Sequence, residues 1–283
     1  MCMKFVLIVC LLLFSLAPIN TQAQTPGIIV RPAGTSGPIV LDPNADGYTS
    51  LTKAGFGLND VTTSEIPYKV VPPVHADPTG DLFRGASGGF SDLVKGIDSS
   101  GFYLFNDGAN LLCRLRMGGI VSGSKGYSIL IDTDGKFGNI GADADPNYVP
   151  ATSGTNGNPG FELEIVLETN SQVAVYNVDG TSTPVLMSTY TIPTNSQISV
   201  AGSTAGGNPD FFYDFYVPFA SLGISASTPI RVVATTVMSP TTAIGGPVSD
   251  IYGVSTGNYM TQWTTAIESQ PPFTFTGIGA TGP

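Results

Sequence analysis

Hydrophobic and polar residues alternate along several short segments of the second half of the chain. In "FELEIVLET", every second position from Phe161 to Leu167 is apolar, and Glu162, Glu164 and Glu168 share the opposite face. A period of two residues is typical of a β-strand with one buried face. The pattern therefore predicts a strand here whose glutamates face solvent.

Other segments have the same character and follow one another at intervals of roughly 10–20 residues, with turn-forming residues between them. They are 101–107, 110–117, 126–132, 171–180, 185–192, 197–202, 211–218 and 230–239. A turn is expected at Asp107-Gly108, and a short helical turn over Phe219–Leu222 should end at Gly223. Together these features predict an all-β fold, an antiparallel β-sandwich of jelly-roll or immunoglobulin-like topology.

Four regions are expected along the chain. Residues 1–23 contain one lysine, an apolar run too short to span a bilayer comfortably and small residues near their end, which is the pattern of a secretory signal peptide. An uncleaved membrane anchor is the alternative. Residues 24–100 form an irregular extension rich in Pro and Gly, 101–268 form the sandwich, and 269–283 form a Gly/Pro/Thr-rich tail or linker.

The charge balance limits the choice of partners. The 283-residue chain has 21 acidic and 11 basic residues, a net charge of −10, and removal of Lys4 with the leader would leave 10 basic residues and a net charge of −11. Such a chain is unsuited to nucleic acid or anionic lipid. A cell-surface or extracellular glycan or protein is the expected partner, with no membrane span after cleavage.

The cysteines exclude an intrachain disulfide in a cleaved chain. Cys2 and Cys10 lie in the leader, so only Cys113 remains, in a strand where a small buried residue is expected. A secreted domain without disulfides needs other means of stabilisation, and bound calcium is one of them.

Two acidic loops have the composition of calcium-binding loops. Calcium takes six to eight oxygen ligands, and alternate acidic or amide side chains before a glycine can turn their oxygens toward one ion. The first loop, "DPNADGYTS", has Lys53 where an EF-hand has its bidentate glutamate, so Asp60, Glu65 or the other loop would have to complete it. Ordinary polar turns are the alternative. The predicted metal ligands are Asp42, Asn44, Asp46, Asp132, Asp134, Asp143 and Asp145.

Catalytic and sugar-binding patterns are also present. "GASGG" at residues 85–89 matches G-x-S-x-G around Ser87, but no strand precedes it and the only histidine, His75, comes before it. Glu162 and Glu164 could form a glycosidase carboxylate pair. Aromatic side chains could stack on sugars. The main candidates are Tyr259 and Trp263, and the others are Tyr213, Tyr216 and Tyr252.

Two resemblances extend these expectations. "FFYDFYVPFASLGI", "GYSILIDTDGKFG" and "FELEIVLE" resemble secreted sandwich domains of the family 9 carbohydrate-binding and DOMON-like type. "LDPNADGYTS", "EIPY", "DLFRGASGGFSD" and "KGYSILIDTDGKFG" are similar to the N-terminal region of large cell-surface proteins of Bacteroidetes, which implies surface display or adhesion.

These observations favour a non-catalytic, secreted or cell-surface module for display or adhesion, stabilised by calcium. A carbohydrate-binding module is the first alternative, and a glycan-active enzyme is the second.

Overall fold

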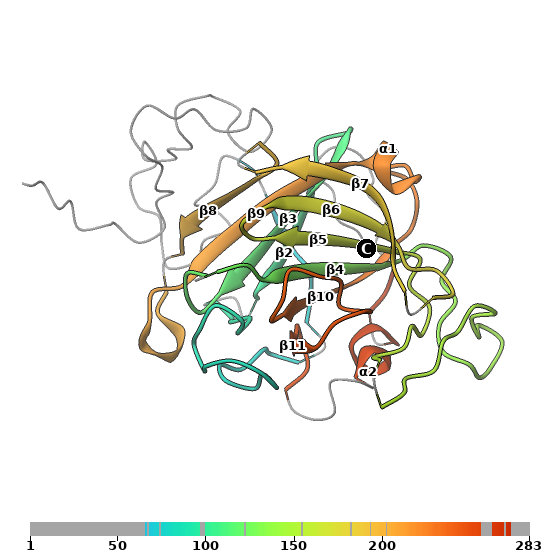
Figure 1. The fold of residues 1–283 in the computed structure, drawn as a ribbon, viewed down its shortest axis with the longest axis horizontal. Helices are drawn as coiled ribbons and strands as arrows, with labels where there is room; N and C mark the ends of the chain where they lie inside the picture. Colours follow the sequence, from blue (N-terminus) through green and yellow to red (C-terminus); the bar gives the residue numbers. More distant parts are fainter. Residues whose placement is uncertain are drawn as a thin grey trace, which may run out of the picture.

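The chain folds into two antiparallel β-sheets packed face to face, so the predicted all-β sandwich is confirmed (Figure 1). The computed structural model describes residues 66, 68–73, 75–96, 100–121, 123–153, 155–181, 183–192, 194–201, 203–255, 262–268 and 270–272. Strand boundaries follow the alternating segments of the sequence closely, because one face of each strand supplies the core between the sheets.

The strands are ordered differently from the sequence. The five-stranded sheet consists of β1 (Lys69–Val70), β2 (Phe102–Asn106), β3 (Asn110–Met117), β9 (Phe211–Pro218) and β8 (Ser196–Val200), in that spatial order. The six-stranded sheet consists of β11 (Val248–Ile251), β10 (Arg231–Val237), β4 (Gly126–Asp132), β5 (Leu163–Glu168), β6 (Gln172–Asn177) and β7 (Val185–Thr191). The strand β11 thus lies at one edge of the larger sheet.

Local connections form as their residues dictate. Asp107 accepts hydrogen bonds from the amides of Ala109 and Asn110, which closes the β2–β3 hairpin at Gly108, where φ is 97°. The helical turn α1 (Phe219–Leu222) ends at Gly223, whose φ of 67° is the left-handed conformation that glycine adopts without strain. Both predicted turns are confirmed.

The main core lies between the sheets. Cys113 and Phe215 point inward from paired strands of one sheet, and Ile129 and Ile165 do so from the other. The Cys113 thiol is buried and unbonded, and burial raises its pKa. Burying each large apolar side chain contributes roughly 1.5–3 kcal/mol, so this layer is the principal source of stability.

The outer faces of both sheets are covered as well. Ile66 and Tyr68, from the N-terminal extension, pack over the five-stranded sheet. Over the six-stranded sheet, the loop through Ala243 and Ile244 packs with the short helix α2 (Trp263–Glu268). None of the described helices is long and apolar enough to cross a bilayer.

The covering loop overturns the expected exposure of the glutamate face. The side chain of Glu164 has no exposed surface, and its Oε1 accepts hydrogen bonds from the Ser128 hydroxyl and the Ala243 amide. Glu168 is also buried. The prediction of a solvated face was wrong because alternation shows which face is polar, but not what a distant loop places over it.

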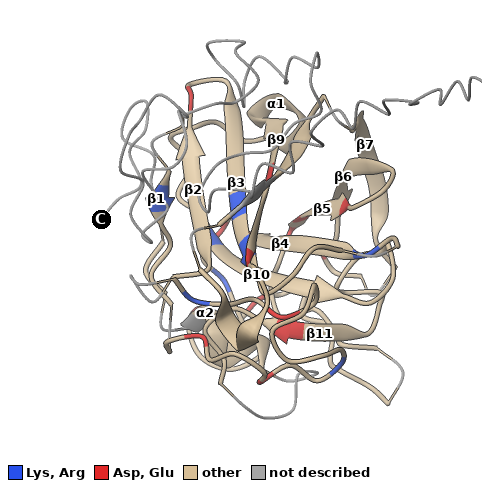
Figure 2. Cartoon of the chain, turned by 90° about the vertical axis from the view of Figure 1, so that its left-hand side faces the viewer, with Lys and Arg blue, Asp and Glu red and all other residues tan. Residues whose placement is uncertain are grey.

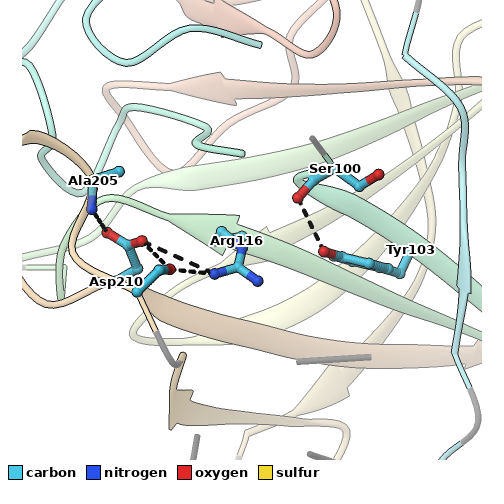
Figure 3. A network of polar contacts seen from close by, with 6 residues as sticks. Ser100, Tyr103, Arg116, Ala205 and Asp210 are labelled. Carbon is cyan, nitrogen blue, oxygen red and sulfur yellow. Dashed lines mark hydrogen bonds and ion pairs between the residues drawn. The ribbon is translucent and has the colours of Figure 1, made fainter. Parts of the chain in front are cut away.

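Two arginines of β3 lie on the outer face of the five-stranded sheet, and each lies beside an aspartate. Arg114 donates to both carboxylate oxygens of Asp214, over distances of 2.7 and 2.6 Å. Arg116 donates to the Ser203 hydroxyl, which donates to Asp210, and a guanidinium nitrogen of Arg116 lies 4.0 Å from the Asp210 carboxylate (Figure 3). Buried carboxylates on this face are thus neutralised by cations of the protein itself.

Candidate metal centre

The structure describes only one of the two predicted calcium loops. Asp42, Asn44, Asp46 and Tyr259 lie outside the described residues. The second loop follows β4 and contains Asp132, Asp134, Asp143 and Asp145, so the site can be built there.

Strand pairing brings the first ligand group together. Asp132 is the last residue of β4, and Glu162 directly precedes β5, which pairs with β4. The Glu162 amide donates to the Ile131 carbonyl over 3.1 Å, which continues the ladder to the end of both strands. Asp134 follows two residues after Asp132, in the turn that the Asp132 carboxylate closes by accepting from the amides of Asp134 and Gly135.

One carboxylate oxygen from each of Asp132, Asp134 and Glu162 lies within 4.8 Å of the other two. Calcium–oxygen distances are about 2.3–2.6 Å, so oxygens on opposite sides of one ion are up to about 5 Å apart. Asp132 is buried and its Oδ2 has no hydrogen-bond partner, whereas Asp134 is exposed and Glu162 is half-buried. The three residues could therefore hold one divalent cation at the surface, open to water ligands.

The electrostatics of this group favour a cation. Burial raises the pKa of Glu162 to about 7, and the neighbouring charges of Asp132 and Asp134 act in the same direction. Burial also raises the pKa of Asp132, although the nearby Arg231 guanidinium opposes this shift. A bound divalent ion would stabilise the ionised carboxylates, which burial otherwise disfavours.

The rest of the acidic loop supports this group without joining it. Asp143 is exposed, and its carbonyl accepts from the Phe137 amide. Asp145 is buried, and its Oδ1 accepts from the Asn147 amide. Burial raises the pKa of Asp145, and the charge of Asp134 acts in the same direction. Neither is within the set of described carboxylates that could share an ion with Asp132.

A buried asparagine fixes the approach to β5. The Asn158 side chain donates to the Phe161 carbonyl and accepts from the amides of Gly160 and Phe161. Gly160 has a φ of 138°, and a Cβ there would lie 2.5 Å from the Lys136 carbonyl. The chain next to Glu162 is therefore held tightly against the acidic loop.

The aromatic candidates for sugar binding are largely internal. Trp263 is 2% exposed and packs edge-on against Phe161, so it offers no ring face to a sugar, which corrects its predicted role. The rings of Tyr213 and Tyr252 are buried in the core between the sheets, and Tyr216 is half-buried. Tyr213 and Tyr252 instead contribute packing, since their rings contact Tyr127 and Phe102 edge-on.

The candidate catalytic residues lack catalytic surroundings. Glu164 is sealed under the loop through Ala243, so a polysaccharide could not reach its carboxylate in this conformation. Ser87 is exposed in an irregular stretch with no strand entering it, and His75 is exposed elsewhere on the same segment. Neither arrangement places a nucleophile beside a base.

Two features of the acidic chemistry were missed in the sequence. Glu162 was assigned to a carboxylate pair on its own strand, whereas the strand register places it beside Asp132 on β4. A second group within 4.8 Å joins Asp77 and Asp81, from the N-terminal extension, to Asp250 on β11. No local spacing signals that group, because Asp250 lies more than 160 residues after Asp77 and Asp81 along the chain.

Comparisons with known proteins find no match to this chain. No protein-family model matches the chain, no curated protein matches it, and no solved structure matches it. The chemistry of the chain itself is therefore the guide to its function.

Proposed function

We propose that this protein is a non-catalytic, secreted or cell-surface module that serves display or adhesion and is stabilised by calcium. The observation that carries the proposal is the group formed by Asp132, Asp134 and Glu162, whose oxygens are close enough to share one ion. Its open side and its all-oxygen ligands suit calcium, which tolerates irregular geometry and water ligands.

The composition supports the same role. The acidic chain has few basic residues, and Cys113 is buried and unbonded, so metal is the natural substitute for disulfides outside the cell. The apolar leader at residues 1–23 and the similarity to N-terminal regions of Bacteroidetes surface proteins supply the proposed location. A glycan or a protein of the cell surface would be the partner.

Calcium binding at the loop is tested with Asp134→Asn. Its carboxylate is exposed, so the substitution should leave the calcium-free fold intact. After chelation, calcium should raise the melting temperature of the wild-type chain, and this rise should be smaller in Asp134→Asn. Asp179→Asn, another exposed acidic position outside the ligand group, is the matched control and should keep the wild-type response.

Location is tested on intact cells of the natural source. A protease added outside should degrade the protein, and N-terminal sequencing of the released chain should begin near residue 24. An intact N-terminus on a protein protected from external protease would overturn the surface role, and an equal calcium response in Asp134→Asn and wild type would overturn the loop site.

A further inference from the structure

The second acidic group connects two parts of the chain that are distant in sequence. Asp77, Asp81 and Asp92 lie on the irregular segment 75–96, which belongs to the N-terminal extension, and Asp250 lies on the edge strand β11. Figure 2 shows acidic positions on β11 and on loops around that end of the molecule. The segment and the strand are already joined by hydrogen bonds from the His75 amide to the Gly253 carbonyl and from the Phe83 amide to the Ser249 carbonyl.

Backbone amides hold the carboxylates but leave several oxygens without a donor. The Gly253 amide donates to Asp77 Oδ1, the Leu93 amide donates to Asp250 Oδ2, and the Gly80 amide donates to Asp92 Oδ2. Asp77 Oδ2 and Asp92 Oδ1 are buried without a hydrogen-bond partner, and neither oxygen of Asp81 reaches a donor on another residue. Buried polar atoms in native proteins almost always have a partner, so these oxygens indicate a ligand.

Three of these carboxylates converge, although both oxygens of Asp250 also accept backbone hydrogen bonds, from the Leu93 and Ile251 amides. One oxygen from each of Asp77, Asp81 and Asp250 lies within 4.8 Å of the others, and Asp77 and Asp250 have no exposed surface. Such a set matches the separation of oxygens around one calcium ion. Asp92 lies close enough for its charge to act on Asp77, Asp81 and Asp250.

No positive charge of the described part of the chain is paired with this group. Among the residues that the structure describes, no lysine or arginine forms an ion pair with any of the four aspartates. Burial and mutual repulsion raise the pKa of Asp77 and Asp250, and they raise that of Asp81 to about 7. A bound divalent cation would relieve both the burial and the repulsion.

We propose that Asp77, Asp81 and Asp250, with Asp92 beside them, form a structural calcium site that fastens segment 75–96 to β11. The site extends the calcium-stabilised module proposed above, but it shares no residue with the loop group at Asp132. Calcium suits it better than magnesium, because the ligands are protein oxygens on irregular backbone, whereas magnesium usually retains several waters in an octahedral shell.

Asp81→Asn gives the sharpest variant. Since the Asp81 oxygens have no donor on another residue, the substitution removes no such hydrogen bond, and it relieves repulsion. Without calcium, Asp81→Asn should melt at or above the wild-type temperature. With calcium, it should bind one equivalent fewer by calorimetry than the wild-type chain.

The rate of trypsin cleavage at Arg84 measures how firmly segment 75–96 is held against β11. Arg84 is exposed on segment 75–96, and trypsin needs local opening to cleave after it. In the purified full-length chain after chelation, calcium at 100 times its dissociation constant should slow this cleavage about 100-fold. The protection should disappear in Asp81→Asn and persist in Asp134→Asn, which separates this site from the loop site.

Two results would overturn the proposal. One is equal calcium protection of Arg84 in wild type and Asp81→Asn. The other is a wild-type chain whose Arg84 cleavage is unaffected by calcium, with Asp77 and Asp81 observed as neutral carboxylic acids by infrared spectroscopy at neutral pH. Asp77→Asn serves as the second variant and should reproduce the loss seen in Asp81→Asn.

Discussion

Two buried acidic regions of this sandwich differ in what balances their charge. On the outer face of the five-stranded sheet, Asp214 pairs with Arg114 at 2.6 Å, and Asp210 lies beside Arg116. At the edge strand β11, Asp77 and Asp250 are equally buried but have no basic partner among the described residues. The first region is complete within the chain, whereas the second has the composition of a site that is completed by a cation.

The difference reflects where each region sits. Arg114 and Asp214 face each other on paired strands of the sheet, so the fold itself sets their distance. The edge group joins an irregular segment to the last strand of the other sheet, where few ladder bonds define the geometry. An ion with several oxygen ligands can order such a junction, because its binding free energy becomes folding free energy.

The largest expected effect comes from breaking the internally paired region. Arg114→Met would leave Asp214 buried without its guanidinium, and breaking a buried ion pair costs about 3–5 kcal/mol. Urea unfolding should show this loss with and without calcium alike. The double variant Arg114→Met with Asp214→Leu should recover a large part of the lost stability. If the loss in Arg114→Met depended on calcium, the ion pair and the acidic group at β11 would not be independent.

Glu164 offers a third kind of buried acid, with neutral donors on its Oε1 and no hydrogen-bond partner on its Oε2. Burial raises its pKa to about 7 from an ordinary 4.5, despite the hydrogen bonds from Ser128 and Ala243. Its contribution to stability is therefore fully present below pH 4.5 and is lost as the pH rises through about 7. At 1.36 kcal/mol per pKa unit, the effect is at most about 3 kcal/mol.

The pH dependence is measured by chemical unfolding in chelator, so that bound metal does not contribute. The Glu164→Gln variant should show a shallower fall in stability between pH 4.5 and 7 than the wild-type chain, because Glu162 and Asp81, whose pKa values burial also raises to about 7, still contribute to the fall. An unchanged slope in the variant would mean that Glu164 stays ionised under the covering loop.

Calcium removal should increase local opening at the acidic group near β11 and leave the Arg114–Asp214 region unchanged. Hydrogen exchange of the Leu93 and Gly253 amides, which donate to Asp250 and Asp77, should accelerate about 100-fold when calcium is withdrawn from 100 times its dissociation constant. The amides between β3 and β9 should keep their protection. A uniform change over both regions would indicate global stabilisation without a local site.

The smallest effect is expected at a position remote from both regions. Gly223 ends α1 with a φ of 67°, and an added Cβ would meet no atom within 4 Å, so Gly223→Ala should cost only the backbone strain of about 1 kcal/mol. Thermal unfolding should show this cost, with an unaltered response to calcium. If Gly223→Ala also changed the response to calcium, a change in that response could arise from any loss of stability and would not indicate a calcium ligand.

Much of the fold could be predicted from periodicity, because the alternating segments became strands, most of them with an apolar face in the central core. The edge strand β7 is the exception, since its Val185, Leu186 and Met187 are exposed. The coverings could not be predicted in this way. The strand β11 and the helix α2 have short, weak patterns, and the loop over Glu164 is positioned by contacts distant in sequence. The burial of Trp263 follows from the same packing.

The candidate ligands also differ in how far they could be predicted from the sequence. Asp132 and Asp134 were predicted as ligands because they are two residues apart before Gly135, within a local turn. Glu162 required the register of β4 with β5, and Asp250 required the packing of segment 75–96 on β11. Local spacing reveals sites formed by one loop, but not sites formed by several.

The calcium site at β11 is tested most directly by a crystal structure of the chain grown with calcium at neutral pH, with the ion located by anomalous scattering. An ion is expected about 2.3–2.6 Å from carboxylate oxygens of Asp77, Asp81 and Asp250. An empty site, with these carboxyl groups sharing protons in short hydrogen bonds, would contradict the proposed calcium site.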